Sequence, residues 1–121
     1  MTSDNKSYHK LIVWEKMKDL LLCTYRIVNT LPKSKEFGLK SQMRRAVVSV
    51  LSNFVEGYLK KSTKEKLHFM EIDETSLFEL EAQGEICYLL QYITQPNYEQ
   101  FEKIRGAAGY FLYKYKSKIN V

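Results

Sequence analysis

The sequence lacks most features of membrane, secreted and turn-rich proteins. Its 121 residues contain only five glycines and two prolines, which disfavours a turn-rich all-β fold. No apolar run approaches the roughly 18 residues that a membrane-spanning helix needs. The first ten residues, MTSDNKSYHK, are polar and lack the apolar core of a signal peptide. We therefore expect a cytoplasmic protein with no membrane partner.

Cysteine and histidine are also scarce, which limits the chemistry that the chain can support. Cys23 and Cys87 lie far apart in apolar helical patterns, so we expect two buried thiols, with a disulfide as the alternative. His9 and His68 provide one Glu-x-x-His pair, whereas a di-iron site in a helical bundle needs two. Ser49 has no histidine on its helix face to act as a base. The sequence therefore predicts no metal, no cofactor, no catalytic residue and no small-molecule substrate.

The length and composition predict one folded domain with a single core. Hydrophobic residues make up 45% of the chain and aromatic residues 13%, which excludes global disorder. The apolar residues recur at spacings of three and four, the period of an amphipathic helix. Residues 1–8 lack this pattern, so we expect a flexible tail followed by a single domain over residues 9–121.

Four segments carry the helical period, and short polar connections separate them. The expected helices cover about residues 9–31, 39–59, 62–93 and 98–118. Pro32 ends the first, because the residue before a proline avoids the helical conformation. Ser62 begins the third, with Glu65 three residues on as in a capping box, and Gln95-Pro96-Asn97 breaks the chain before the fourth. Short connections make neighbouring helices antiparallel, so the sequence predicts an all-α, up-down-up-down four-helix bundle.

The second expected helix is apolar around most of its circumference, which is unusual for a surface helix. One narrow polar stripe interrupts it at helical spacing: Gln42, Arg45, Ser49, Asn53 and Glu56. We expect these side chains to be buried and to find partners on another helix or subunit, such as Glu79 and Glu81. Our first interpretation is a buried polar network that fixes the register of the helices. The alternative is a functional pocket beside Ser49 and Asn53.

Glycines at two places in the sequence carry expectations of their own. Gly57, near the end of the second helix, is expected to weaken or terminate it. Gly106-Ala107-Ala108-Gly109 lies in the middle of the fourth helix. We expect these small residues to allow close approach of another helix rather than to bind phosphate.

Charge is distributed unevenly along the chain, and the net value of +5 hides this pattern. Residues 1–66 carry a net charge of +8, residues 67–102 carry −8 and residues 103–121 carry +5. Three interpretations stay open: complementarity between neighbouring helices, complementarity between subunits, or a basic face for nucleic acid.

An antiparallel bundle brings the second connection and the end of the fourth helix to the same end of the molecule. Lysines and tyrosines gather there, and phosphate attraction combined with aromatic stacking is the minimum for RNA contact. The candidate nucleic-acid-binding residues are Lys60, Lys61, Lys64, Tyr113, Lys114, Lys116 and Lys118. Solvated lysines that favour the helix dipole are the alternative interpretation.

Several motifs in combination resemble a known family. They are Leu11-Ile12-Val13-Trp14, Leu31-Pro32, Phe37-Gly38-Leu39, Gln42, Arg44-Arg45-Ala46, Val48-Ser49-Val50, Ser52-Asn53, Glu56-Gly57, Phe69, Ser76 and Glu79-Leu80-Glu81. Over about residues 8–93 the sequence resembles the bacterial four-helix bundle proteins encoded in intervening sequences of 23S rRNA genes. The resemblance implies an up-down bundle and a homo-oligomer, with pentameric rings among the members, and no established enzymatic activity.

The resemblance implies RNA as a partner only indirectly, through the location of the family's genes. A related accessory protein of diversity-generating retroelements forms similar rings and binds nucleic acid. The sequence departs from the family pattern at Leu51, often proline, at Val55, often alanine, and at Asp73 and Thr75, usually small residues. We expect these departures to alter packing between the second and third helices.

Three functional hypotheses follow from these observations. The leading one is a non-enzymatic, oligomeric bundle that binds RNA through a basic surface. The second is a structural or protein-interaction module whose charge segregation serves ring assembly. The third is an enzyme that uses the polar stripe of the second helix.

Overall fold

A computed structural model describes residues 7–119, and this part of the chain contains four α-helices. They are α1 (Ile12–Thr30), α2 (Ser41–Leu59), α3 (Thr63–Leu89) and α4 (Gln95–Ile119). Short 3-10 helices at Ser7–Lys10 and Lys33–Lys35, and a kinked π turn at Glu36–Lys40, complete the order. Residues 1–6 of the expected tail lie outside the described residues, and Ser7 and Tyr8 belong to the first 3-10 helix.

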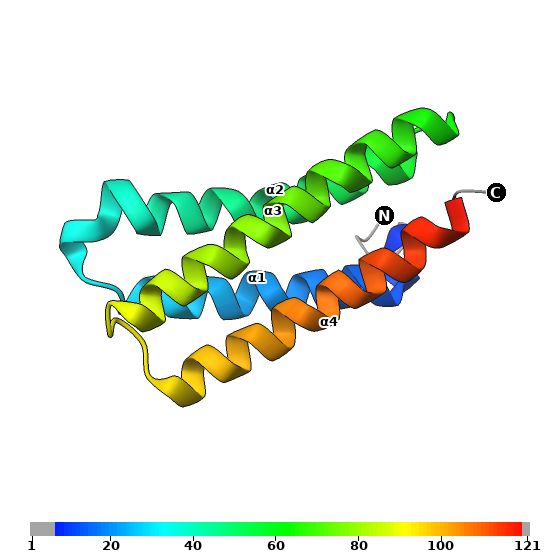
Figure 1. The fold of residues 1–121 in the computed structure, drawn as a ribbon. Helices are drawn as coiled ribbons and strands as arrows, with labels where there is room; N and C mark the ends of the chain where they lie inside the picture. The colour runs from blue at the N-terminus through cyan, green and yellow to red at the C-terminus, as the bar shows by residue number, and fades with distance from the viewer. Residues whose placement is uncertain (1–6, 120–121) are drawn as a thin grey trace.

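Consecutive helices run antiparallel, and each one packs against two others (Figure 1). α2 contacts α1 and α3, and α4 contacts α3 and α1, so the chain closes into a bundle. The α1–α2 and α3–α4 connections lie at one end. The α2–α3 connection lies at the other end, with the start of α1 and the end of α4. The predicted all-α, up-down-up-down bundle is confirmed.

Local sequence explains two of the helix ends as predicted. α1 stops because Leu31 precedes Pro32 and adopts an extended conformation, with ψ of 154°. Ser62 caps α3, where its hydroxyl accepts a hydrogen bond from the backbone N–H of Glu65 at 3.0 Å.

α3 ends at Leu89, four residues earlier than predicted. Gln91 has a φ of 61°, the left-handed conformation that ends many helices. This geometry lets the backbone N–H of Tyr92 donate to the Cys87 carbonyl at 2.9 Å. The sequence does not reveal this end, because the residue is glutamine rather than the glycine that usually marks it.

α4 begins at Gln95, three residues earlier than predicted. The hydroxyl of Thr94 accepts a hydrogen bond from the backbone N–H of Asn97 at 3.3 Å, which caps the helix. Pro96 fits in the first turn, where its missing N–H has no helical partner to lose. The Gln95-Pro96-Asn97 segment therefore starts a helix instead of breaking one.

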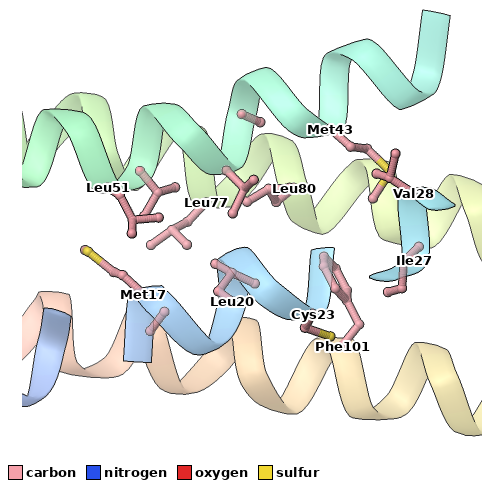
Figure 2. Close-up of a cluster of buried hydrophobic side chains, with 14 of the residues drawn as sticks. Met17, Leu20, Cys23, Ile27, Val28, Met43, Leu51, Leu77, Leu80 and Phe101 are labelled. Carbon is pink, nitrogen blue, oxygen red and sulfur yellow. The ribbon is translucent and has the colours of Figure 1, made fainter. Parts of the chain in front are cut away.

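Apolar side chains from all four helices meet in the centre of the bundle (Figure 2). Among the fully buried ones are Met17, Leu20, Met43, Leu80 and Phe101. Cys23 and Cys87 are buried free thiols, so the prediction of two thiols is confirmed. Within residues 7–119 no helix is long and apolar enough to cross a membrane.

Two glycines allow helices to approach closely. A Cβ added at Gly57 would lie 2.8 Å from the Cβ of Phe69 on α3. One added at Gly84 would lie 2.5 Å from the ring of Phe101 on α4. Both distances are well below the roughly 3.5–4.0 Å of an ordinary carbon contact. Gly57 is therefore a packing residue inside α2, not the terminator that the sequence suggests.

The glycines of α4 do not have the predicted packing role within the chain. A Cβ added at Gly106 or Gly109 would meet no other atom within 4 Å. Ala108, between them, is fully buried. The Gly106–Gly109 segment thus faces the core through one alanine only.

Candidate functional site

Within the single chain, the polar stripe of α2 is not the buried network that the sequence predicts, and partners on another subunit stay a prediction. Gln42, Arg45 and Glu56 are exposed, whereas Ser49 and Asn53 are half-buried. Neither Arg45 nor Glu56 forms an ion pair within residues 7–119. The reason is geometric, because α3 covers only the edge of the stripe that carries Ser49 and Asn53.

Ser49 and Asn53 belong to a small hydrogen-bonded cluster between α2 and α3. The hydroxyl oxygens of Ser49 and Ser76 are 2.9 Å apart. The amide nitrogen of Asn53 donates to the Ser49 hydroxyl at 2.9 Å and to the Ser49 carbonyl at 3.0 Å. No histidine bonds to this cluster in the part of the chain that the structure describes, so Ser49 has no base to activate it. The cluster joins two helices.

Glu81 pairs with α4 rather than with α2. Its carboxylate accepts a hydrogen bond from Arg105 Nη2 at 2.9 Å, and Arg105 also binds both oxygens of Glu102 at 3.0 and 3.1 Å. Burial lowers the pKa of the Arg105 guanidinium, but the bond and charge of Glu102 and the charge of Glu81 together raise it above the ordinary value. Lys116 and Glu74 pair at 2.9 Å. Complementarity between neighbouring helices is thus confirmed for α3 and α4.

The lysines near the α2–α3 connection differ in their surroundings. Lys61 and Lys64 are exposed. Lys60 lies 3.9 Å from the carboxylate of Glu65, and its ammonium is 5.5 Å from the centre of the Phe69 ring. Only Lys61 and Lys64 are therefore fully available to an external anion.

The predicted basic residues of α4 face two different sides of the helix. Tyr113 and Lys116 line a hollow between α3 and α4. Lys114 and Lys118 line a groove between α1 and α4. Side chains four residues apart share a helix face, whereas those two apart do not. The predicted patch is therefore split by α4. We call the four exposed lysines of this region the basic end: Lys61, Lys64, Lys114 and Lys118.

A groove between α1 and α2 leaves apolar side chains uncovered. Its volume is about 260 Å³, and its lining is Trp14, Leu21, Val48, Leu51, Ser52 and Val55. A hollow of about 300 Å³ beside Tyr8, Val55 and Leu59 continues it. Leu59 at this end is 67% exposed. We call this surface the α1–α2 groove. Exposed Arg45 lies one helical turn from Val48 on the same side.

A second apolar surface follows the outer side of α3. Phe78, Ala82, Ile86 and Leu89 recur at spacings of three and four, so they share one face of the helix. Phe78 is 67% exposed and Leu89 68%. Glu79 and Glu85 flank this α3 stripe, and neither forms an ion pair within residues 7–119. The sequence contains the signal for the stripe, but our prediction considered only the inward residues of this helix.

Asp73 is a buried carboxyl group that is not among the predicted site residues. It is 0% exposed, and neither oxygen has a hydrogen-bond partner within the described residues. Burial, with a smaller contribution from the charge of Glu74, raises its pKa from 3.8 to about 9. Asp73 is therefore neutral at pH 7. The signal was its helical spacing from Met70 and Leu77, which places it on the buried face.

No cluster suited to a metal ion occurs between residues 7 and 119, where no three His, Cys, Asp or Glu side chains gather. Burial also raises the pKa of the Cys87 thiol to about 11, so this sulfur is not a thiolate at neutral pH. Among the described residues, the two uncovered apolar surfaces, the basic end and the groove between α1 and α4 are thus candidates for binding a partner.

Known proteins that resemble this chain share its fold. The family model described as 23S rRNA-intervening sequence protein matches residues 9–110. A crystal structure described as a protein with unknown function from the S23 ribosomal protein family of Bacteroides thetaiotaomicron is similar, with a TM-score of 0.79 and 20% identity. The similarity covers 91% of this chain and 96% of that chain, and at this identity it shows the fold. No curated protein matches this chain.

Proposed function

Since the chain belongs to the 23S rRNA-intervening sequence protein family, we propose that it is a non-enzymatic bundle that works by assembling with copies of itself. The observation that carries the proposal is the presence of two different uncovered apolar surfaces, the α1–α2 groove and the α3 stripe. Monomeric proteins rarely leave such surfaces open to water. We place this assembly in the cytoplasm, where buried free thiols stay reduced.

The two surfaces match each other in length, and Arg45 supplies a charge of opposite sign at one end of the groove. The groove runs from Val48 to Leu59 and the stripe from Phe78 to Leu89, and each span of 11 residues rises about 16 Å. Exposed Arg45 beside the groove is opposite in sign to the acids that flank the stripe. A ridge of side chains on one helix that fits between two helices of a neighbour gives ordinary helix packing.

Contact between two different surfaces is heterologous, so it repeats from one copy to the next. Such contacts build a closed ring when the rotation between copies closes. Rings, pentameric ones among them, are also what the family resemblance implies. The proposed product is therefore a cyclic homo-oligomer held by the α1–α2 groove and the α3 stripe.

Sedimentation velocity tests this assembly with two variants, each of which replaces an apolar side chain by glutamate, and with a mixture of the two. Val48→Glu blocks the groove and Phe78→Glu blocks the stripe, so each variant alone is expected to sediment as a monomer. A one-to-one mixture keeps one intact groove and one intact stripe, and it is expected to form a heterodimer that grows no further.

Tyr110→Glu is the matched control, because Tyr110 is exposed on the outer side of α4 and belongs to neither surface. It is expected to leave the assembly intact. A wild-type chain that stays monomeric at high micromolar concentration would refute the proposal. A mixture that stays monomeric would refute the pairing of groove with stripe.

We propose nucleic-acid binding by the basic end as a second function. The specific observation is that Lys61, Lys64, Lys114 and Lys118 are exposed and form no ion pair with residues 7–119. A ring repeats these four lysines in every subunit, which multiplies weak phosphate contacts into avidity. RNA is the expected partner.

An anisotropy titration with rRNA fragments at two salt concentrations tests the second function. Neutralising the basic end with glutamine is expected to weaken binding and to reduce its salt dependence. Lys33→Gln/Lys35→Gln removes charge at the opposite end of the bundle and is expected to change binding little. Absence of salt-sensitive binding at micromolar protein would refute RNA binding but leave the assembly proposal intact.

A further inference from the structure

The groove between α1 and α4 differs from the other uncovered surfaces because it combines apolar walls with lysines. We call it the α1–α4 groove, and it lies at the end of the bundle where α1 begins and α4 ends (Figure 1). Its volume is about 190 Å³, and it is lined by Leu11, Ile12, Val13, Phe111, Lys114, Tyr115 and Lys118. None of these residues is acidic, so the groove favours an anionic ligand with an apolar part.

The α4 wall of this groove alternates aromatic rings with lysines. Phe111, Lys114, Tyr115 and Lys118 follow the spacing i, i+3, i+4, i+7, which keeps them on one face of the helix. Each turn thus supplies one ring and one ammonium group. Lys114 and Lys118 are exposed, form no ion pair with residues 7–119, and lie about 6 Å apart along the helix axis.

The rings at the base of the groove are held in place. Tyr115 packs against Phe54, with ring centres 5.2 Å apart, and against Tyr58 at 6.4 Å. Burial raises the pKa of the Tyr115 hydroxyl, so it carries no charge that would repel an anion. A ring that is already fixed loses little conformational entropy when a ligand stacks on it.

The size of the groove limits its ligand to a small planar group. Pockets for drug-sized ligands begin at about 300 Å³, so this one is too small for a whole cofactor. Proteins bind single strands through a positive track next to aromatic rings on which bases stack. The paired bases of a duplex cannot reach such rings, because they are already stacked inside the helix.

We infer that the α1–α4 groove accepts one unpaired base of single-stranded RNA, while Lys114 and Lys118 hold the neighbouring phosphates. This inference rests on the proposed RNA binding and names its site and the class of RNA. Phe111 supplies the stacking surface. Lys61 and Lys64 contribute charge from the other side of the basic end without contacting the base.

Anisotropy with a labelled eight-nucleotide oligo(U) strand tests the inference. Phe111→Leu keeps an apolar side chain but removes the ring, and it is expected to weaken binding at least about fivefold, the lower bound for loss of one base–aromatic stack. Phe37→Leu makes the same change at a ring that is exposed at the opposite end of the bundle, and it is expected to have no effect. Phe111→Tyr is expected to restore binding, and thermal unfolding confirms that each variant folds.

An abasic strand of equal length and charge separates base recognition from phosphate attraction. It is expected to bind at least about fivefold more weakly than oligo(U), and Phe111→Leu is expected to make no further difference to it. Lys114→Gln/Lys118→Gln is expected to reduce the salt slope on oligo(U) by about 1.4, the value for two phosphate contacts on a single strand. A duplex of the same length is expected to be insensitive to Phe111→Leu.

The outcomes distinguish failure of the inference from failure of the proposed function. If no RNA binds the wild-type protein, the proposed RNA binding fails and the inference fails with it. If oligo(U) binds but Phe111→Leu matches Phe37→Leu, or the abasic strand binds equally well, only the inference is overturned. If dodecyl phosphate binds through Lys114 and Lys118 and oligo(U) does not, the groove takes an anionic amphiphile and the inference is also overturned.

Discussion

Helix α2 packs mainly against α3 and α1, and it does so in different ways. Against α3 its contacts include small and polar residues, with Gly57 in close contact with Phe69 and a hydrogen bond between Ser49 and Ser76. Against α1 it uses larger apolar residues that leave the α1–α2 groove open. The first interface is closed within the chain, whereas the second still exposes an apolar surface.

This difference shows where α2 is specified by its own chain and where a partner is needed. Close approach at Gly57 leaves no room for another molecule between α2 and α3. Hydrogen bonds across that interface also fix the register of the two helices. Val48, on the other side of α2, is nearly half exposed, so contacts within its own chain bury only part of its side chain. The four predictions below test this contrast, from the largest expected effect to the smallest.

Replacing Asp73 by asparagine is expected to give the largest change in stability. The carboxyl group has a pKa of about 9 when folded and 3.8 when unfolded, so at pH 7 unfolding releases a proton. The contribution of Asp73 to the free energy of unfolding is therefore less favourable at pH 7 than at pH 4 by about 4 kcal/mol. Because asparagine does not titrate, Asp73→Asn is expected to recover much of that free energy at pH 7.

The pH profile of unfolding by urea measures this effect and its sign. A raised carboxyl pKa means that the contribution of Asp73 to stability is highest below about pH 4, falls as the pH rises towards 9 and then stays constant. The profile of Asp73→Asn is expected to be flatter over that window. Asp19→Asn, which changes an exposed residue of α1, is the control and should keep the wild-type slope. Equal slopes for wild type and Asp73→Asn would contradict a buried neutral carboxyl.

Replacing Gly57 by alanine tests the closed interface directly. The added methyl group would overlap Phe69 and Met70, and overpacking of this kind costs about 1–3 kcal/mol. Gly106→Ala is the matched control, because its methyl group meets open space and alanine favours the helix by about 1 kcal/mol over glycine. Thermal unfolding should therefore shift in opposite directions for the two variants. A stabilising Gly57→Ala would show that α2 and α3 are not closely packed.

Replacing Ser76 by alanine is expected to have a smaller effect. It removes the bond to Ser49, worth about 1 kcal/mol, while Ser49 keeps its bond with Asn53. Ser52→Ala, on the exposed side of α2, is expected to change the free energy of unfolding by less than about 0.5 kcal/mol. A double-mutant cycle with Ser49→Ala would yield a coupling near zero if the two serines do not interact in solution.

The sequence predicted the fold well because helical periodicity and two terminators carry most of that information. Pro32 and Ser62 mark their helix ends through backbone geometry and a side-chain cap, which are local effects. The end of α3 was not predicted, because Gln91 adopts a left-handed conformation that glutamine rarely takes. The start of α4 escaped because a proline marks both helix starts and helix breaks.

The candidate site was harder to predict, because its residues depend on which helix covers which face. Arg45 and Glu56 share a face with Ser49 in sequence, yet α3 covers only one edge of that face. Glu81 forms an ion pair with Arg105 on α4. This pair could be predicted only if the adjacent helices were known. Spacing gives the face of a helix, but only tertiary packing decides which part of that face is buried.

Replacing Val55 by leucine tests the open side of α2 and is expected to have the smallest effect. Val55 lines the α1–α2 groove two residues before Gly57, so the extra methylene extends into open space. In the Phe78→Glu background, where we expect a monomer, the free energy of unfolding should change by less than about 0.5 kcal/mol. A loss as large as that of Gly57→Ala would mean that both sides of α2 are closed. The contrast between the two interfaces, and with it the reason to expect a partner in the groove, would then fail.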